Sequence, residues 1–289
     1  MILVVGATGD VGGAICRRLL EAGHEVTILV RPGSAYESLV DAGARPVTGD
    51  LKDPVSLAVA CTGVDTVMTT ANSAKRSGAD HVESVDRQGN RNLVDAARDA
   101  RASTFIFVSI LGADPDSPNP FVRAKAETEQ AIQGSGMRYT ILRPNIFIDV
   151  WAPVVVGIPL QSGRPVRLVG QGDHRHSFIF SGDVAAFAVA ALGHPDAADR
   201  ILTIGGPEPL TWRDIVARVE RVTGAPIATE FVGPDDEMPG LPPFVGALLP
   251  MQETYESPIE MDELARRYGV RLTPFDEVAR RVFGAPPPS

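Results

Sequence analysis

Short apolar runs alternate with stretches of helical periodicity along the first half of the chain. The first run, Met1 to Val5, shows no polar alternation, as in a strand buried on both faces of a parallel sheet. Later runs predict strands at residues 25–30, 44–50, 64–70, 104–108 and 139–143. The intervening stretches predict helices at residues 13–22, 36–42, 85–97 and 121–133, with another beginning near Pro54. This alternation predicts an α/β fold built on a doubly wound parallel sheet.

The regular alternation ends after residue 144, and a second lobe is expected beyond it. Residues 151–175 are rich in Val, Pro and Gly, and residues 232–250 hold five prolines in predicted loops. A predicted strand at 200–204 could return to the main sheet, and Thr211 is expected to cap a helix. We therefore expect a small substrate-binding lobe that is discontinuous in sequence. The expected division assigns residues 1–150 and 181–204 to the main domain, and residues 151–180 and 205–289 to the lobe.

Three glycines follow the first predicted strand directly and precede a predicted helix. Gly6 allows a sharp strand-to-helix turn, Gly9 lets a phosphate approach the backbone, and Gly12 lets the helix pack closely on the strand. The start of that helix directs unpaired N–H groups toward a pyrophosphate. A tight turn without a ligand is the alternative. The order of strand, glycines and helix favours a Rossmann-type dinucleotide-binding fold.

The end of the second predicted strand indicates which dinucleotide is bound. Arg31 lies 19 residues after Gly12, where dinucleotide folds place the residue that contacts the adenine ribose. An acidic residue there would accept a hydrogen bond from a 2′-hydroxyl, whereas the arginine fork suits a 2′-phosphate. We therefore predict NADP(H) as the cofactor. Asp50 and Leu51 end the third strand near the expected adenine position, and Asp50 can also cap the helix beginning near Pro54.

Composition narrows the classes of partner. The chain has 289 residues, of which 44% are hydrophobic, and a net charge of −9 without a long basic run. Nucleic acid and anionic membranes are therefore not expected as partners. Cys16 and Cys61 are the only cysteines, and they form neither a disulfide framework nor a metal motif. With no basic leader before the first strand and no apolar run of membrane-spanning length, we expect a cytoplasmic protein.

Several motifs along the chain together point to a known family. They are Gly6–Gly12, Leu29-Val-Arg31-Pro, Gly49-Asp50-Leu51, Gly63-Val-Asp-Thr-Val67, Thr140-Ile-Leu-Arg-Pro144 and Asp183-Val-Ala185. Over about its first 205 residues the chain is similar to atypical short-chain dehydrogenase/reductases of the NmrA-like type. That family includes isoflavone-type, quinone and triphenylmethane-dye reductases, and also NADP-sensing regulators without enzyme activity.

The resemblance implies a set of cofactor-binding residues. It assigns the 2′-phosphate to Arg31, the adenine to Asp50 and Leu51, and the nicotinamide side to Thr70 and Ala71. The pyrophosphate is assigned to the turn Gly6, Ala7, Thr8, Gly9, Asp10, Val11 and Gly12.

The catalytic pattern of the superfamily is only partly present. Fully catalytic members carry a serine and a YxxxK motif, in which the tyrosine moves the proton and the lysine lowers its pKa while holding the nicotinamide ribose. This chain has Phe121-Val-Arg-Ala-Lys125 at that place, so the lysine is present and the phenol is missing. Alignment of the preceding strand puts Ile110, not Ser109, at the serine position. Lys125 matches the lysine that isoflavone-type reductases use without a tyrosine, and it is the predicted catalytic and ribose-binding residue.

Three histidines are further candidates. His174 or His176 could face the substrate, or both could be solvated loop residues. His81 could overhang the nicotinamide from the loop at 73–81. No third ligand is expected near the histidine pair, so no metal is expected.

Two classes of function fit these features. The first is an NADPH-dependent oxidoreductase that reduces a small aromatic or quinone-like substrate by hydride transfer. The second is an NADP(H)-binding redox-sensing regulatory or assembly protein without catalysis. A sugar-nucleotide epimerase is disfavoured because such enzymes need the tyrosine. The expected partner is a small-molecule substrate, with the chain as a monomer or homodimer.

Overall fold

The computed structural model describes residues 1–74, 76, 78–241 and 243–284. Two positions of the predicted loop at 73–81 therefore lie outside the described residues. The chain divides into two compact units, and the first comprises Met1–Pro144, Val184–Thr203 and Tyr268–Val270. The second unit contains the remainder of the described chain. The first segment of this unit thus ends at Pro144, where residue 150 was expected. The unit also includes a short segment from near the C-terminal end of the chain.

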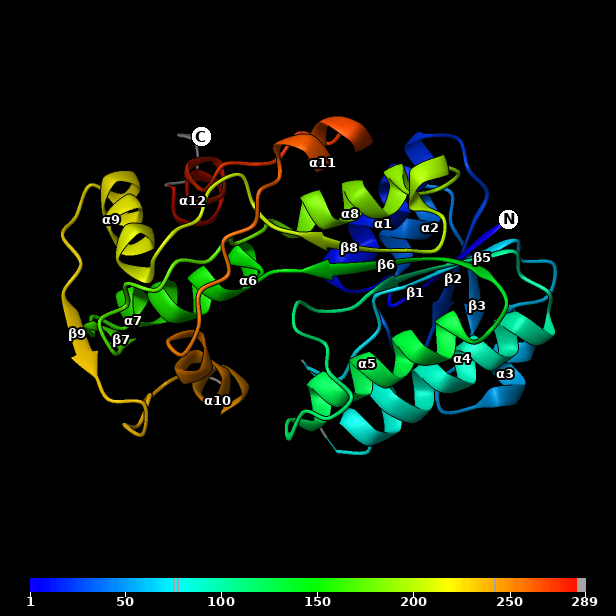
Figure 1. Ribbon diagram of the computed structural model, residues 1–289, viewed down its shortest axis with the longest axis horizontal. Helices are drawn as coiled ribbons and strands as arrows, with labels where there is room; N and C mark the ends of the chain where they lie inside the picture. Colours follow the sequence, from blue (N-terminus) through cyan, green and yellow to red (C-terminus); the bar gives the residue numbers. More distant parts are fainter. Residues whose placement is uncertain (75, 77, 242, 285–289) are drawn as a thin grey trace. The chain divides into compact units, whose positions relative to one another are not determined.

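A seven-stranded sheet forms the centre of the first unit (Figure 1). Strand β1 (Ile2–Val5) lies between β2 (Val26–Val30) and β4 (Thr66–Thr69) and runs parallel to both. The other strands are β3 (Arg45–Thr48), β5 (Thr104–Val108), β6 (Arg138–Pro144) and β8 (Arg200–Ile204). Their order, β3-β2-β1-β4-β5-β6-β8, places the first strand in the interior of the sheet. The doubly wound parallel sheet predicted from the sequence is confirmed.

Helices cover both faces of this sheet. Figure 1 shows α3 (Pro54–Ala60), α4 (Gln88–Asp99) and α5 (Pro120–Gln133) on one face. The other face carries α1 (Asp10–Glu21), α2 (Glu37–Asp41) and α8 (Ser181–Ala190). A π-helix, η1 (Val82–Arg87), leads into α4, and a 3-10 helix, η3 (Pro195–Ala197), precedes β8.

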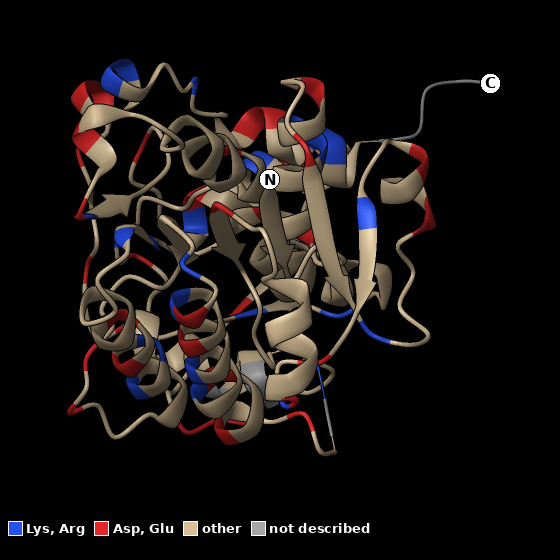
Figure 2. Ribbon diagram, turned by 90° about the vertical axis from the view of Figure 1, so that its right-hand side faces the viewer, with Lys and Arg blue, Asp and Glu red and all other residues tan. Residues whose placement is uncertain are grey.

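The core explains why the central strands contain no charged residues. Leu3 of β1, Leu57 of α3, Leu93 of α4 and Phe105 of β5 are all fully buried in one cluster. Because the sheet is covered on both sides, neither face of a central strand meets water. Strands β1, β2, β4 and β5 contain no Lys, Arg, Asp or Glu, and these residues gather on helices and loops (Figure 2).

Side-chain caps define where two of the covering helices begin. Asp53 Oδ1 accepts a hydrogen bond from Val55 N at 3.0 Å and caps α3. The expectation that Asp50 can cap this helix is wrong, because its carboxylate accepts from Lys52 N at 2.8 Å instead. Asn119 caps α5 by accepting from Phe121 N at 2.9 Å. Each cap satisfies N–H groups that the helix cannot pair internally.

The second unit is built mainly from helices around a small sheet. Its helices are α6 (Ile148–Ala152), η2 (Pro153–Gly157), α7 (Ile158–Gln161), α9 (Trp212–Thr223), α10 (Pro243–Gln252), α11 (Asp262–Tyr268) and α12 (Phe275–Phe283). Strands β7 (Val166–Val169) and β9 (Thr229–Val232) pair in parallel. Trp212, Ile215, Phe178 and Val156 are buried in its core.

One sequence expectation fails in this unit. Part of the proline-rich stretch at 232–250, which was expected to form loops, is the helix α10, with Pro250 inside it. Residues 151–175, for which no element was predicted, contain short helical segments and the strand β7. The predicted N-cap of α9 is confirmed, because Thr211 and Asp214 form a reciprocal capping box. Across the described parts of the chain, no helix combines the length and the apolar character that a membrane span requires.

One backbone contact joins β1 to the helix that follows it. A Cβ added at Gly12 would lie 2.2 Å from the carbonyl oxygen of Gly6, which is far inside any real contact. A Cβ added at Gly9 would lie 3.4 Å from the same oxygen, an ordinary distance. Gly12 is therefore required for the close approach of α1 to β1, and Gly9 is not.

We expect Gly12→Ala to lower the free energy of unfolding by about 1–3 kcal/mol, the usual effect of forcing extra volume into a packed site. Gly9→Ala is the matched control, because Gly9 has an extended backbone that any residue adopts, and it should change stability by less than about 1 kcal/mol. Urea denaturation of the wild type and both variants measures the difference. Equal stability of the two variants would contradict this account of Gly12.

Candidate functional site

The glycine-rich turn brings the ends of two neighbouring strands together. Gly6 has φ +86°, a conformation that L side chains rarely adopt, and Gly9 N donates to its carbonyl oxygen at 3.0 Å. A Cβ at Gly6 would lie 2.8 Å from Thr70 Oγ1 and 2.9 Å from Ala71 N. The turn after β1 therefore lies directly against the residues that follow β4. Both sets meet at the carboxyl edge of the sheet, where α/β folds bind ligands.

A pocket opens at this edge. Six of the predicted cofactor-binding residues line it, namely Gly6, Thr8, Arg31, Asp50, Leu51 and Ala71. Thr70 lies beside Gly6, and the other residues of the turn lead into or form the first turn of α1. The glycine cradle and the arginine therefore fit the pyrophosphate and ribose ends of a dinucleotide. Lys125 does not line this pocket.

Charged side chains that the sequence reasoning missed surround Arg31. The carboxylate of Asp80 forms ion pairs with Arg31 and Lys52, and Arg76 Nη1 lies 3.4 Å from it. The hydrogen bond from Lys52 lowers the pKa of Asp80 below its ordinary value, and the same bond raises the pKa of Lys52. These residues come from three separate loops, so no periodicity or motif links them in sequence.

Lys125 is buried on α5, with only 2% of the residue exposed. Its Nζ donates to the carbonyl oxygen of Val108 at 3.3 Å and lies 4.9 Å and 5.5 Å from the ring centroids of Phe107 and Phe121. Burial lowers the pKa of Lys125, and the nearby carboxylate of Asp86 opposes that shift. A buried lysine with a lowered pKa gives up its proton more readily than a solvated one.

Asp86 is the buried acid beside this lysine. It is fully buried, and it accepts a hydrogen bond from Ser73 N at 3.0 Å and another from Ser73 Oγ. Burial raises the pKa of Asp86, against the opposing effect of Lys125. Its Oδ1 has no hydrogen-bond partner among the described residues. One oxygen of Asp86 therefore accepts no hydrogen bond from the described residues, although this carboxylate lies close to the buried cation of Lys125.

Ser109 belongs to a second buried network. Its hydroxyl donates to Glu129, whose carboxylate also binds Arg143 through contacts of 3.0 Å and 2.6 Å. Glu129 and Arg143 come from α5 and β6, so this network ties the helix that carries Lys125 to the sheet.

The candidate histidines lie in different environments. His176 is fully buried, with Nε2 2.9 Å from the carbonyl oxygen of Gln252 and Nδ1 2.7 Å from Ser257 Oγ. The alternative that both loop histidines are solvated is therefore wrong for His176. His81 is the N-cap residue of η1, and its N–H donates to Ser84 Oγ at 3.1 Å.

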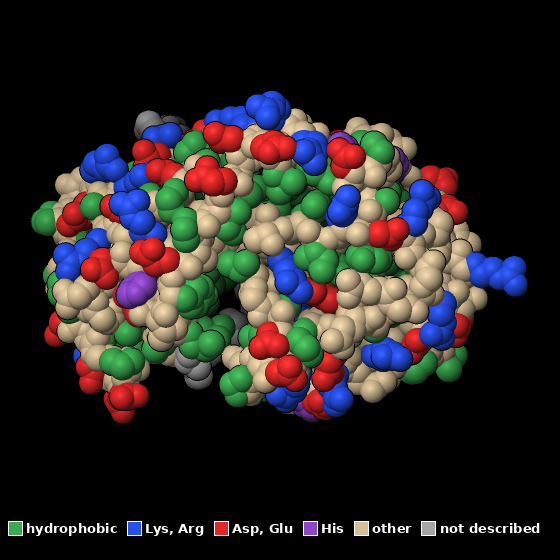
Figure 3. All heavy atoms as spheres, in the orientation of Figure 1, with side chains coloured by type: hydrophobic (Ala, Val, Ile, Leu, Met, Phe, Trp, Pro, Cys, Tyr) green, Lys and Arg blue, Asp and Glu red, His purple; other side chains and the backbone are tan. Residues whose placement is uncertain are grey.

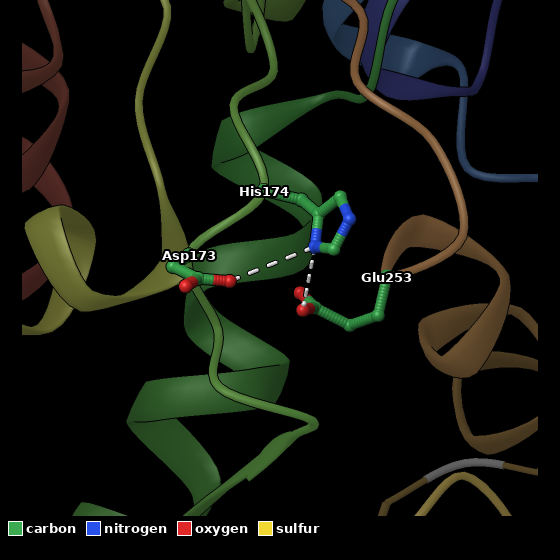
Figure 4. Close-up of side chains that lie close together, drawn as sticks. All are labelled: Asp173, His174 and Glu253. Carbon is green, nitrogen blue, oxygen red and sulfur yellow. Dashed lines mark hydrogen bonds and ion pairs between the residues drawn. The ribbon is translucent and has the colours of Figure 1, made fainter.

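His174 lies in an acidic cluster of the second unit (Figure 4). Its Nδ1 is 3.2 Å from Glu253 Oε2 and 3.7 Å from Asp173 Oδ1, and the three ligand atoms all lie within 4.8 Å of one another. The expectation that no third metal-ligand residue lies near His174 is wrong, because Glu253 approaches it from a distant part of the chain. The contact with His174 engages Glu253 Oε2, whereas the buried Oε1 of Glu253 has no hydrogen-bond partner among the described residues. Burial raises the pKa of Glu253, whose side chain is almost fully covered.

A family model described as NAD(P)H-binding matches residues 6–195. This chain belongs to the NAD(P)H-binding family. The match confirms the resemblance to NmrA-like short-chain dehydrogenase/reductases and the binding of a nicotinamide dinucleotide. It covers all of the predicted cofactor-binding residues, whose individual roles remain predictions.

Two relatives in this family have different described functions. An NAD(P)H azoreductase of Xenophilus azovorans is 32% identical over 227 residues, which cover 78% of this chain and 75% of the relative. A photosystem II assembly factor of Cyanophora paradoxa is 31% identical over 226 residues, covering 77% of this chain and 68% of the relative. The family therefore includes both a reductase and an assembly factor at nearly equal distance from this chain.

A solved structure extends the likeness to the whole fold. The NADPH-dependent quinone oxidoreductase of Escherichia coli, complexed with NADPH, matches with a TM-score of 0.82 and 21% identity. The match covers 98% of this chain and all of the other. At this identity it establishes the fold and not the substrate.

The burial of His176 predicts a pH dependence of stability. Burial lowers its pKa below the usual 6.5, so below that pH the unfolded chain binds a proton that the folded imidazole does not. Stability should therefore fall as the pH drops below about 6.5, by at most about 1.4 kcal/mol per pH unit from this group.

The measurement is urea denaturation at pH 7.5 and pH 5.5 for the wild type and His176→Gln. Carboxylates titrate equally in both proteins, so the difference between the two pH profiles isolates the imidazole. If the free energy of unfolding of His176→Gln falls as much between pH 7.5 and pH 5.5 as that of the wild type, the assignment of the pH dependence to His176 is contradicted.

Proposed function

We propose that this protein is an NADPH-dependent oxidoreductase that reduces a small aromatic or quinone-like substrate. The observation that carries the proposal is the pocket that combines the glycine-rich turn with Arg31 at the end of β2. The azoreductase relative supports a reductase of conjugated acceptors. Basic and acidic side chains are interspersed on the face seen in Figure 3, which suits a small-molecule substrate better than a polyanion.

The choice of NADPH rests on the chemistry at the end of β2. Arg31 lines the pocket beside Asp50 and Leu51, and a guanidinium can form two parallel hydrogen bonds with a phosphate. An arginine, and not an acidic residue, occupies the sequence position from which a carboxylate would accept a hydrogen bond from the ribose 2′-hydroxyl. The arginine therefore favours the cofactor with a 2′-phosphate.

The acceptor class follows from the groups around Lys125. When bound, NADPH supplies hydride, and a ketone reduced in this way needs a proton donor beside its oxygen. Phe121 cannot donate a proton. Lys125 is held by the carbonyl of Val108, beside the rings of Phe107 and Phe121, and is almost completely buried. Quinones and cationic dyes give delocalised or neutral products that can take protons later from water, so they suit this site better than simple ketones.

The alternative function is an NADP(H)-binding regulatory or assembly protein without catalysis. The photosystem II assembly factor among the relatives supports it, and so does the phenylalanine in place of tyrosine. Both functions use the same pocket, so NADPH oxidation in the presence of acceptors distinguishes them.

We expect Arg31→Ala to weaken NADPH binding by roughly 1.5–3 kcal/mol, the usual contribution of a charge-assisted contact. Binding of NADH should change little, because NADH lacks the 2′-phosphate. Fluorescence titration of both cofactors measures this, with the exposed Arg91→Ala on α4 as the control. Equal affinity of the wild-type protein for NADH and NADPH would contradict the choice of cofactor.

We expect the purified protein to oxidise NADPH with quinones and cationic dyes and not with unactivated ketones. Phe121→Tyr should change quinone reduction by less than about threefold, because no proton donor is needed there. Lys125→Met should impair both cofactor binding and turnover if the lysine holds the nicotinamide ribose. Assays that follow the loss of NADPH absorbance with each of a panel of acceptors provide the measurement.

Two results would change this conclusion. Efficient reduction of simple ketones by the wild type would contradict the account of Phe121. Tight NADPH binding without reduction of any acceptor would favour the regulatory or assembly function.

A further inference from the structure

Among the described residues, three cations converge on a single carboxylate at the rim of the pocket. Arg31 follows β2, Lys52 follows β3, and Arg76 and Asp80 lie in the loop after β4. Arg31 Nη1 binds Asp80 Oδ2, and Lys52 Nζ binds Asp80 Oδ1. Arg76 Nη1 lies 3.4 Å from Oδ2. One carboxylate therefore satisfies cations from three separate loops.

The acid is more enclosed than its partners. The side chain of Asp80 is 14% exposed, whereas those of Arg31 and Lys52 are 36% and 34% exposed. Lys52 has a second acidic neighbour, because its Nζ lies 3.7 Å from Asp50 Oδ2. Asp80 thus lies at the centre of the cluster, and the more exposed cations lie around it.

The same guanidinium cannot serve two anions equally well. Arg31 is the residue whose position fits the 2′-phosphate, and in this structure its Nη1 is bound to Asp80. A phosphate that reached Arg31 would also approach the Asp80 carboxylate, and two anions at hydrogen-bond distance from one cation repel each other strongly. Either Asp80 moves away or the phosphate binds weakly.

We propose that Asp80 acts as an internal substitute for the 2′-phosphate, and that the phosphate displaces it from Arg31, Lys52 and Arg76. Asp80 then sets the affinity for the phosphorylated cofactor without contacting it, and Lys52 and Arg76 become phosphate ligands in addition to Arg31. The inference rests on the proposed use of NADPH and deepens it, because it identifies a residue that determines specificity.

A pair of small nucleotides tests this without any catalytic readout. Adenosine 2′,5′-bisphosphate and adenosine 5′-monophosphate differ only in the 2′-phosphate, so the ratio of their affinities reports the phosphate subsite alone. Isothermal titration calorimetry on the full chain gives both dissociation constants. The variants are Asp80→Asn, Lys52→Met and Arg76→Met, with Asp41→Asn as a control that removes one exposed negative charge from α2.

We expect Asp80→Asn to tighten binding of the bisphosphate by about tenfold and to leave the monophosphate within about twofold, since the competing anion is gone while the cations remain. Lys52→Met and Arg76→Met should each weaken only the bisphosphate, by roughly threefold or more. Asp41→Asn should leave the ratio unchanged. In the double variant Asp80→Asn/Lys52→Met, the two effects should not add, because both residues belong to one network.

The outcomes separate this inference from the choice of cofactor. If the wild type prefers the bisphosphate and Asp80→Asn weakens it or has no effect, Asp80 positions Arg31 rather than competing for it, and the inference is overturned. If the wild type shows no preference and Asp80→Asn creates one, the inference stands and the use of NADPH fails. If neither protein prefers the bisphosphate, both fail.

Discussion

The close approach of Gly12 to the carbonyl oxygen of Gly6 is the constraint on which the site depends. No side chain fits between these atoms, so the first turn of α1 lies against the end of β1. The left-handed backbone of Gly6 in turn brings the β1 turn against Thr70 and Ala71 after β4. Because β1 lies in the interior of a parallel sheet, its carboxyl end has neighbouring strands on both sides. The end of β2 then contributes Arg31 to the same pocket.

The features that sequence predicted correctly are those set by local chemistry. The central strands carry no charged side chain because the sheet is covered on both faces, and that pattern is visible without a structure. The N-cap Thr211 directly precedes the helix that it caps, so it too is visible in sequence. The glycine spacing and Arg31 both predict the pocket because each is tied to a strand end.

The features that sequence missed depend on contacts between distant segments. Asp80 reaches Arg31 and Lys52 from a loop that has no regular pattern, and Glu253 reaches His174 from another helix end. Asp50 and Asp53 are both plausible caps by type, and only the backbone geometry shows that Asp53 is the one used. The prolines of residues 232–250 predict loops, but part of this stretch is the helix α10. Pro243 stands at the first position of that helix, where proline is tolerated.

The residues that bear on the choice between a reductase and a regulator lie outside the pocket. The glycine-rich turn and Arg31 serve cofactor binding in either case, so neither feature bears on catalysis. The buried cluster around Lys125 is a separate feature, in which the cation lies near the carboxylates of Asp86 and Glu129. Burying a charge without full pairing is unfavourable, and one oxygen of Asp86 has no partner among the described residues. Perturbed groups of this kind gather at functional sites and also occur in structural ion-pair networks. The cluster therefore fits a lysine that holds the nicotinamide ribose in a reductase or in a regulator, and only turnover distinguishes the two.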